Sequence, residues 1–180
     1  IFPGTREGEI TLNWPLFRDV ARRMMAEGCC RHVVVAGTPG GYYPDPQGFL
    51  VHRGDPDLVL AASTAVLVKS GTTVLEAAWT GTPMVVAYRS PRVTYEIARH
   101  LMTVEWISLA NLVLAAPLVP EFWRLPVRAA EVADALRPLL DESTPEAAAQ
   151  RAGLKRVRDL LGSRGAADRV ADMALDLLAC

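Results

Sequence analysis

Two short segments combine glycine with hydroxyl side chains where a strand is expected to end: FPGTR at residues 2–6 and KSGTT at residues 69–73. Glycine lets the backbone approach a ligand closely, and hydroxyl groups can hydrogen bond to phosphate oxygens. The second segment also begins a predicted helix, where free N–H groups and the positive end of the helix dipole favour an anion. We therefore expect a phosphate to bind near Ser70, Gly71 and Thr72.

Glu76 lies four residues beyond Thr72, which places both residues on one face of the predicted helix. A carboxylate in this position accepts hydrogen bonds, so it suits sugar hydroxyl groups better than it suits a phosphate. A phosphate near Ser70 and a ribose on Glu76 would together make a nucleotide site. The alternative is that Ser70 only caps the helix and Glu76 is solvated, and the pattern alone favours neither.

Two arginines also follow predicted strand ends. Arg6 comes just after the first segment, and a guanidinium group can grip diphosphate oxygens in bidentate fashion. Its alternative role is a surface salt bridge with Glu7 or Glu9. Arg89 ends a predicted strand beside Tyr88 and has the same two interpretations.

The elements that must position these residues alternate between helix and strand. Residues 13–27 predict an amphipathic helix, with Asn13 as its N-cap and Pro15 in its first turn. The β-branched run at 32–37 is typical of a buried parallel strand, and residues 38–48 form a loop rich in Gly and Pro. Further strands are expected at 49–52, 65–69 and 83–88, and helices at 55–63, 72–79 and 92–102. Repeated units of this length predict a parallel sheet covered on both faces.

The second half of the chain is predicted to be mainly helical. The apolar residues of helix 92–102 that we expect to face inward are Val93, Ile97, Ala98 and Leu101. The apolar segment from Trp106 to Trp123 predicts core or an interdomain face, with contact to a membrane surface as the alternative. Residues 128–179 predict two or three helices, broken near Pro138, near Pro145 and at 162–165.

Composition excludes several classes of protein. With 51% hydrophobic and 22% charged residues, the 180-residue chain is typical of a folded domain. The formal net charge of -1 gives no field that would attract nucleic acid. No apolar stretch approaches a membrane span, and no signal-peptide pattern is present, so we expect a cytoplasmic protein. The chain opens as though cut within a strand, which suggests a fragment of a longer polypeptide.

Cysteine and histidine spacing predicts no metal site. Cys29 and Cys30 are adjacent and Cys180 is distant, a pattern that builds neither a disulfide framework nor a metal knuckle. The three histidines are far apart, which makes a zinc site improbable. The Gly-x-Ser-x-Gly and Walker patterns are also absent, which disfavours a serine hydrolase and a P-loop NTPase.

Several collinear stretches resemble the bacterial lipid A disaccharide synthase family. FPGTREGEI is similar to the family's turn, Pro-Gly-Ser-Arg followed by a Glu, and SGTTVLEAAWTGTPMVVAYR is similar to its long signature. The similarity continues through TYEIARHL, WISLANLV and VPE at 119–121. It spans most of the chain in one order, which makes it more specific than any single motif.

The resemblance implies a fold and a reaction. Family members are GT-B glycosyltransferases with two Rossmann-like domains, and this chain resembles only the C-terminal, donor-binding half. We therefore expect an α/β fold, a Rossmann-like parallel sheet with helices on both faces and a helical C-terminal tail. Residues 1–127 would be the nucleotide-sugar-binding domain, and 128–180 would be helices that pack on it or on the missing N-terminal domain. The family transfers a sugar from UDP-2,3-diacylglucosamine to 2,3-diacylglucosamine 1-phosphate with inversion and without a metal or another cofactor.

The resemblance also implies partners and site residues. The expected partners are UDP or a UDP-sugar, an acylated glucosamine acceptor and the missing N-terminal domain, which would carry the general base. Peripheral contact with the inner face of the membrane and a homodimer are left open. The nucleotide-sugar-binding residues that match the family are Gly4, Thr5, Arg6, Ser70, Gly71, Thr72, Glu76, Tyr88, Arg89, Asn111 and Glu121.

Apart from one mild change at Thr5, this sequence departs from the family pattern outside the nucleotide-facing turns. Thr5 replaces the usual Ser, Ala110 replaces a Pro, and Arg124 stands where a Gln is usual. Residues 115–117 replace a Gly-Arg, and the loop at 40–48 stands where a helix is expected. Two alternatives therefore stay open: another GT-B UDP-sugar enzyme, such as an N-acetylglucosamine transferase or a UDP-N-acetylglucosamine 2-epimerase, and a non-catalytic nucleotide-binding or assembly domain.

Overall fold

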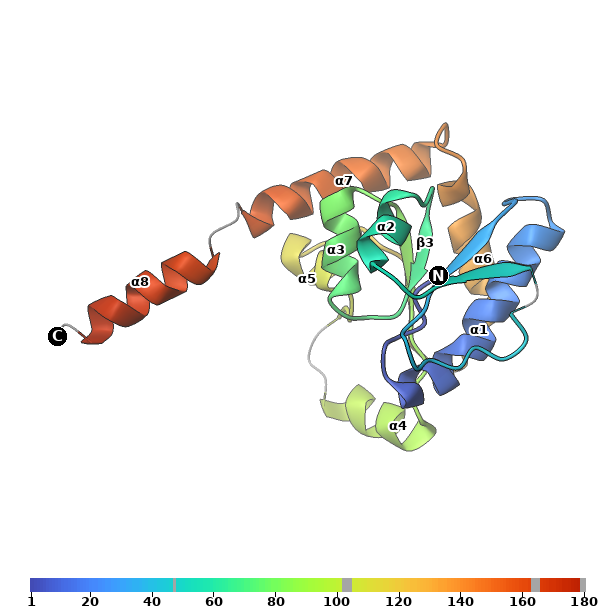
Figure 1. Ribbon diagram of the computed structural model, residues 1–180, viewed down its shortest axis with the longest axis horizontal. Coiled ribbons are helices and arrows are strands. Elements are labelled where there is room, and N and C mark those ends of the chain that lie inside the picture. Colours follow the sequence, from blue (N-terminus) through green and yellow to red (C-terminus); the bar gives the residue numbers. More distant parts are fainter. Residues whose placement is uncertain (47, 102–104, 163–165, 179–180) are drawn as a thin grey trace.

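The computed structural model describes residues 1–46, 48–101, 105–162 and 166–178, and Figure 1 shows its elements. The strands are β1 (Val33–Ala36), β2 (Phe49–His52), β3 (Val66–Val68), β4 (Met84–Ala87) and β5 (Glu121–Phe122). The helices are α1 (Glu7–Ala26), α2 (Pro56–Ala61), α3 (Thr73–Thr80), α4 (Arg92–Leu101), α5 (Leu109–Leu114), α6 (Ala129–Leu136), the 3-10 helix η1 (Arg137–Leu140), α7 (Pro145–Leu161) and α8 (Ala166–Leu178).

The strands are parallel and follow the Rossmann order. β1 pairs with β2, and β4 lies between β3 and β5. Residues 1–2 join the two sets, because Phe2 N–H donates to the Leu67 carbonyl (2.8 Å) and Ala36 N–H donates to the Ile1 carbonyl (3.0 Å). The spatial order is therefore β2, β1, residues 1–2, β3, β4, β5. This order reverses direction between residues 1–2 and β3, which is where ligands of such sheets bind.

Helices cover both faces of the sheet, as the sequence predicts. Alternate residues of β3 and β4 point to opposite sides, because side chains alternate along a strand. Val66, Val68, Met84 and Val86 pack with apolar residues of α2, α3, α5 and α7. Leu67, Val85 and Ala87 pack with apolar residues of α1 and α6. The α/β class and the Rossmann-like sheet predicted from the sequence are confirmed.

The first helix begins earlier than predicted. α1 starts at Glu7, so Asn13 is not its N-cap and Pro15 lies inside the helix rather than in its first turn. Asn13 is fully buried: its Nδ2 donates to the Glu9 carbonyl (2.8 Å), and its Oδ1 accepts a hydrogen bond from Arg89 N–H (2.8 Å). Asn13 therefore ties α1 to the end of β4, a tertiary role that a capping pattern cannot reveal.

Helix α4 lies away from the sheet, at the bottom of the view in Figure 1. Val93 was predicted to face inward, but 71% of it is exposed, so that prediction is wrong. The side chains of Ile97, Ala98 and Leu101, the other predicted inward positions, lie outside the described residues. A contact from α4 to the rest of the chain is the edge-to-face stack of Tyr95 on Trp123, with ring centroids 6.3 Å apart.

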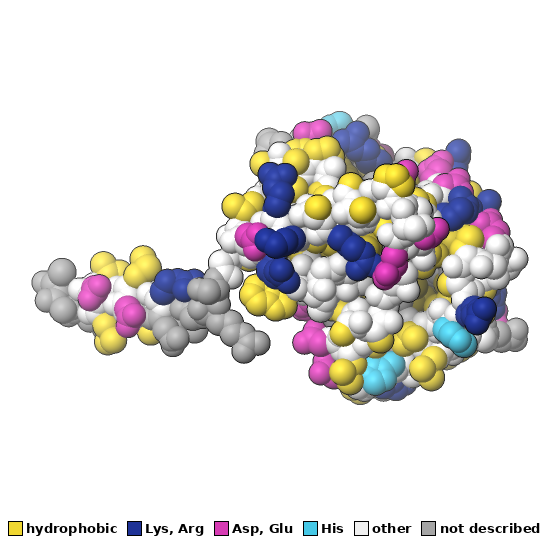
Figure 2. Space-filling model, turned by 90° about the horizontal axis from the view of Figure 1, so that it is seen from above, with side chains coloured by type: hydrophobic (Ala, Val, Ile, Leu, Met, Phe, Trp, Pro, Cys, Tyr) yellow, Lys and Arg dark blue, Asp and Glu magenta, His cyan; other side chains and the backbone are white. Residues whose placement is uncertain are grey.

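The C-terminal helices differ in what they contact. α6 packs on α1, and α7 packs on α3 and α5. α8 projects away from the rest of the chain, and its described apolar side chains Val170, Met173, Leu175 and Leu177 are exposed. Figure 2 shows apolar and acidic side chains along α8, and charges of both signs interspersed on the face above α7. Over the described ranges, no helix has both the length and the apolar character required to cross a membrane.

Candidate functional site

A cavity of about 360 Å³ opens at the carboxyl ends of the strands, on either side of the point where the strand order reverses. Its walls come from the loops that follow residues 1–2, β1, β2 and β3. The predicted site residues that line it are Gly4, Thr5, Ser70, Gly71, Thr72 and Glu76. The two turns selected from the sequence therefore meet in one cavity, at the place where open α/β sheets bind ligands.

The first turn is built around Gly4. Gly4 has φ +128°, a conformation that other residues rarely adopt, and a Cβ there would lie 2.8 Å from Glu9 Cβ. Thr5 is exposed, and its N–H donates to Glu9 Oε2 (3.3 Å). The Arg6 side chain is 85% exposed, lies 3.5 Å from Glu9 Oε1 and does not line the cavity. The salt bridge considered for Arg6 thus exists, and most of the guanidinium side chain is exposed to solvent.

The second turn leads into α3, but Ser70 does not cap that helix. α3 begins at Thr73 with Thr72 at the N-cap position, and the Ser70 hydroxyl donates to the Ile107 carbonyl (2.8 Å). Among the described residues, the backbone N–H groups of Gly71, Thr72 and Thr73 have no acceptor. These free donors at a helix N-terminus can bind an anion.

Glu76 leaves its carboxylate available in the same cavity. Its side chain is half-buried, and it has no hydrogen bond or ion pair with another described residue. It stands one turn into α3, beyond the free N–H groups. The arrangement can therefore bind an anion at the helix start and hydroxyl groups one turn farther along.

Sequence reasoning missed two charged residues between the turns. Lys69 Nζ donates to Glu9 Oε1 (3.0 Å), and both side chains line the cavity with about a fifth of their surface exposed. Burial would raise the pKa of the Glu9 carboxyl, but the hydrogen bond and charge of Lys69, helped by the Thr5 and Arg6 amides, lower it below its ordinary value. Lys69 is the first residue of the KSGTT segment and Glu9 follows the FPGTR segment by three residues, so their positions in the sequence were the available signal.

Tyr88 and Arg89, which follow the end of β4, lie in different environments. Lys69 Nζ lies 5.9 Å from the centre of the Tyr88 ring, within the range of a cation–π contact, so Tyr88 stands behind the lysine. Arg89 Nη2 donates to the Val127 carbonyl (3.0 Å), and Arg89 does not line the cavity. The guanidinium is thus bound to the chain segment that leads to α6.

Asn111 and Glu121 line a second hollow rather than the main cavity. Asn111 is buried, and its Nδ2 donates to Glu121 Oε1 (2.7 Å). Glu121 also accepts hydrogen bonds from the N–H groups of Ile107 (2.7 Å) and Ser108 (2.9 Å). Because the Ile107 carbonyl accepts the Ser70 hydroxyl, this pair braces the loop that holds the second turn. Their polar atoms therefore support the main cavity from outside it.

Another cavity, of about 410 Å³, lies at the opposite, amino ends of the strands and is lined in part by Cys29, Cys30 and His32. Burial, and then neighbouring Cys29, raise the pKa of the Cys30 thiol, which disfavours the reactive thiolate. No group of three or more His, Cys, Asp or Glu residues that could hold a metal occurs within the described ranges. The cavity at the carboxyl ends is thus the better candidate for binding.

The family model and the relatives that this chain matches share one description. The family model described as Lipid-A-disaccharide synthetase matches residues 1–171. Lipid-A-disaccharide synthase of Syntrophus aciditrophicus is 33% identical over 188 residues, which cover 99% of this chain and 49% of that protein. The enzyme of the same name from Azotobacter vinelandii is 38% identical over 152 residues, or 78% of this chain and 40% of that protein. That from Myxococcus xanthus is 34% identical over 191 residues, or 99% and 48%. The chain spans about half the length of the curated relatives it matches.

Proposed function

Because the chain belongs to the lipid-A-disaccharide synthetase family, we propose that it is the donor-binding half of a glycosyltransferase that makes a lipid A disaccharide. The donor would be UDP-2,3-diacylglucosamine and the acceptor 2,3-diacylglucosamine 1-phosphate, with UDP as the second product. The observation that carries the proposal is the cavity at the reversal of strand order, which offers free helix N–H groups and the Glu76 carboxylate together.

The cavity suggests how the nucleotide would bind. The diphosphate would lie between the turn at Gly4 and Thr5 and the N-terminus of α3 at Gly71 and Thr72. The ribose hydroxyl groups would donate to Glu76, whose carboxylate has no partner among the described residues. Ser70 would act by holding its loop to Ile107. Tyr88, Arg89, Asn111 and Glu121 would then shape and brace the site from its edges.

The chemistry proposed for this half is stabilisation of the leaving group. As the bond from the sugar to UDP breaks, negative charge grows on the diphosphate. The N–H groups at the start of α3, whose orientation is fixed by the helix, and the exposed Arg6 guanidinium would stabilise that charge, which is the role a metal plays in other transferases. The general base and the acceptor pocket would lie on the N-terminal half of the polypeptide.

The packing supports the proposed organisation of the chain. Residues 1–127 would form the donor-binding domain, and 128–180 the C-terminal helices, of which α6 and α7 pack on that domain. The exposed apolar residues of α8 are consistent with a contact to another domain or a second copy of the chain. Because both substrates carry acyl chains, we place the reaction at the inner face of the membrane.

The names of the relatives support the synthase over other UDP-sugar enzymes of the same architecture, since the three compared above share one name. An activity assay on the full-length polypeptide separates them. Turnover of UDP-diacylglucosamine is expected, whereas turnover of UDP-N-acetylglucosamine alone would favour an N-acetylglucosamine transferase or an epimerase. Binding of UDP without any turnover would favour the non-catalytic alternative.

Donor binding can be tested on the chain itself by calorimetry with UDP and ADP. We expect UDP to bind more tightly than ADP, and Glu76→Ala and Arg6→Ala each to weaken UDP binding by about tenfold, the effect of one charge-assisted hydrogen bond. Matched controls are Glu146→Ala, an acidic residue in the first turn of α7, and Arg128→Ala, an exposed arginine that pairs with Glu131. Equal affinity for UDP and ADP, or an equal loss of UDP affinity in the control variants, would contradict the donor-site proposal.

A further inference from the structure

The charges within the main cavity do not suit a diphosphate as they stand. Among the described residues, the ionisable side chains that line it are Glu9, Lys69 and Glu76. Lys69, the cation among these three, donates to Glu9 Oε1 at 3.0 Å and is thereby neutralised. Two carboxylates and one paired lysine leave a net negative lining, which repels a diphosphate unless the lysine is released.

Glu9 occupies the position of an anion in the site. One oxygen accepts the Lys69 ammonium, the other accepts the Thr5 N–H at 3.3 Å, and the Arg6 guanidinium lies 3.5 Å away. An ammonium, a backbone N–H and a guanidinium are the groups that bind phosphate oxygens in other proteins. The carboxylate thus holds together donors from both turns that a diphosphate could also use.

The contacts that hold Glu9 are of a kind that a ligand can exchange. The Thr5 hydrogen bond is long, and the Arg6 side chain is mostly exposed. Gly71 has no side chain, and a Cβ there would lie 3.5 Å from Lys69 Nζ, so the ammonium stands beside the start of α3. The centre of the Tyr88 ring lies 5.9 Å from the same ammonium, and the ring would stay beside it after the Glu9 hydrogen bond breaks.

Resting on the proposed function, we infer that Lys69 is the side-chain cation that binds the diphosphate of the UDP-sugar, and that Glu9 is a resident carboxylate which the diphosphate displaces. In the empty site Glu9 keeps Lys69 ordered and neutralises its charge. On binding, the ammonium moves its hydrogen bond from the carboxylate to a phosphate oxygen, and no covalent bond changes. By competing for Lys69, Glu9 thereby lowers the affinity of the site for the donor.

Calorimetry of UDP and of uridine on the 180-residue chain and two variants tests this inference. Uridine has the base and ribose of UDP without its phosphates, so it reports binding that does not involve Lys69. Lys69→Met is expected to weaken UDP binding by about tenfold or more, the effect of losing a charged hydrogen bond, and to leave uridine binding unchanged. Glu9→Gln, which removes the competing charge, is expected to tighten UDP binding by about threefold or more.

Two further variants control for charge and folding. Lys69→Arg keeps the positive charge and should retain most of the UDP affinity. Lys155→Met removes a lysine from an exposed pair with Asp159 at 2.9 Å on α7 and should change nothing. Circular dichroism and urea unfolding establish which variants fold, and Glu9→Gln alone decides the matter if Lys69→Met does not fold, because tighter UDP binding requires a displaced competitor.

The possible outcomes are distinct. If the pair is only structural, Lys69→Met and Glu9→Gln will change UDP and uridine binding by the same factor or change neither, and the inference is overturned. Looser UDP binding by Glu9→Gln, with uridine unchanged, would also overturn it, because Glu9 would then assist the diphosphate. If the unmodified chain binds UDP no better than ADP, the proposed function itself fails, whatever the two variants do.

Discussion

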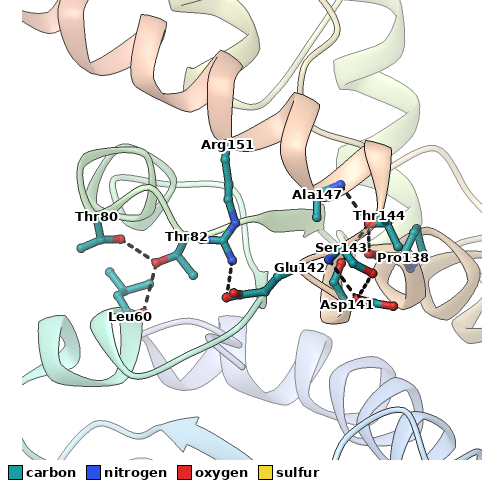
Figure 3. A network of polar contacts seen from close by, with 10 residues as sticks. All are labelled: Leu60, Thr80, Thr82, Pro138, Asp141, Glu142, Ser143, Thr144, Ala147 and Arg151. Carbon is teal, nitrogen blue, oxygen red and sulfur yellow. Dashed lines mark hydrogen bonds and ion pairs between the residues drawn. The ribbon is translucent and has the colours of Figure 1, made fainter.

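The two ends of the parallel strands differ in how their polar groups are bonded. We call the end where the strands begin the amino edge and the end where they finish the carboxyl edge. At the amino edge, the Thr82 hydroxyl bonds to Thr80 (2.8 Å) and to the Leu60 carbonyl (3.1 Å), as Figure 3 shows. Nearby, the Gln150 amide accepts from Met84 N–H (2.6 Å) and donates to the Met84 carbonyl (3.1 Å), as a neighbouring strand would. At the carboxyl edge, the first N–H groups of α3 and the Glu76 carboxylate have no partner among the described residues.

This difference separates structure from function within one sheet. Buried polar groups that lack a partner are costly, so a fold satisfies them wherever no ligand is going to do so. The amino edge follows that rule and should determine stability. The carboxyl edge leaves polar groups open to the cavity and should determine binding. Mutations at the two edges should therefore separate the free energy of unfolding from UDP affinity.

The largest effect on stability is expected at the amino edge from Gln150→Leu. The leucine cannot pair with Met84, so a buried N–H and a buried carbonyl lose their partner, at a cost of about 2–4 kcal/mol. Urea unfolding should show a lower midpoint with an unchanged slope, and UDP affinity of the folded chain should stay the same.

Arg151→Leu is the matched control, because it makes a similar change at the next residue of α7. Figure 3 shows Arg151 paired with Glu142 (2.9 Å), an exposed pair whose loss should cost less than about 1 kcal/mol. Equal destabilisation by the two variants would mean that Gln150 does not act through Met84.

Gly4→Ala should be the next largest change and should affect both properties. Alanine is strained at φ +128°, and its Cβ would lie 2.8 Å from Glu9 Cβ, so we expect a loss of about 2 kcal/mol in stability. The displaced turn should also weaken UDP binding. Gly8→Ala is the control: a Cβ there meets nothing within 4 Å in helix α1, and it should raise stability by about 0.5–1 kcal/mol. Gly4→Ala with unchanged UDP affinity would remove this turn from the site.

Much of the fold could be predicted from the sequence because its signals are local. The β-branched runs of β1, β3 and β4 and the Gly- and Pro-rich loops place the elements within a few residues. The errors fall where distant contacts decide. Asn13 has the residue type of a helix cap but accepts a hydrogen bond from Arg89, which is distant in the sequence. Val93 is apolar but exposed, because its helix does not pack on the sheet. No local pattern carries that information.

The candidate site divides in the same way. Gly4, Ser70 and Gly71 were identified because glycine and hydroxyl residues at strand ends have a direct physical meaning, and Glu76 because it lies one helical turn beyond Thr72. All four line one cavity. The Glu9 to Lys69 pair was missed because its partners are 60 residues apart in the sequence. Likewise, only the folded chain reveals that the Ser70 hydroxyl is directed to Ile107 rather than to its own helix.

A smaller effect on stability is expected from Thr144→Ala, again at the amino edge. The Thr144 hydroxyl accepts a hydrogen bond from Ala147 N–H (3.2 Å) at the start of α7, and Figure 3 shows it within a set of turn contacts. Loss of this N-cap should cost about 1 kcal/mol in urea unfolding, while Thr144→Ser, which can also cap a helix, should retain most of the stability. UDP affinity should not change in either variant. A loss of binding would contradict the separation of the two edges.

The smallest expected effect tests whether the carboxyl edge contributes to stability at all. Lys69 keeps the folded pKa of Glu9 below its ordinary value of 4.5. A carboxyl group whose pKa is lowered by folding stabilises the chain above its ordinary pKa, and the contribution is lost as the pH falls through the folded value. The difference in unfolding free energy between the unmodified chain and Glu9→Gln should therefore be about 1 kcal/mol or less at pH 7, should decrease as the pH falls below 4.5 and should vanish below the folded pKa.

Adding saturating UDP makes the same measurement a test of both edges. If the diphosphate takes Lys69 from Glu9, the carboxyl group loses its partner, and the acid-dependent difference should shrink while total stability rises through ligand binding. Thr144→Ala should show no such change with UDP, because no group at the amino edge exchanges a protein partner for the ligand. A Glu9 contribution to stability that grows when UDP binds would mean that the Glu9–Lys69 pair stabilises the fold, as Gln150 does. Binding of the diphosphate would then be left to the N–H groups at the start of α3.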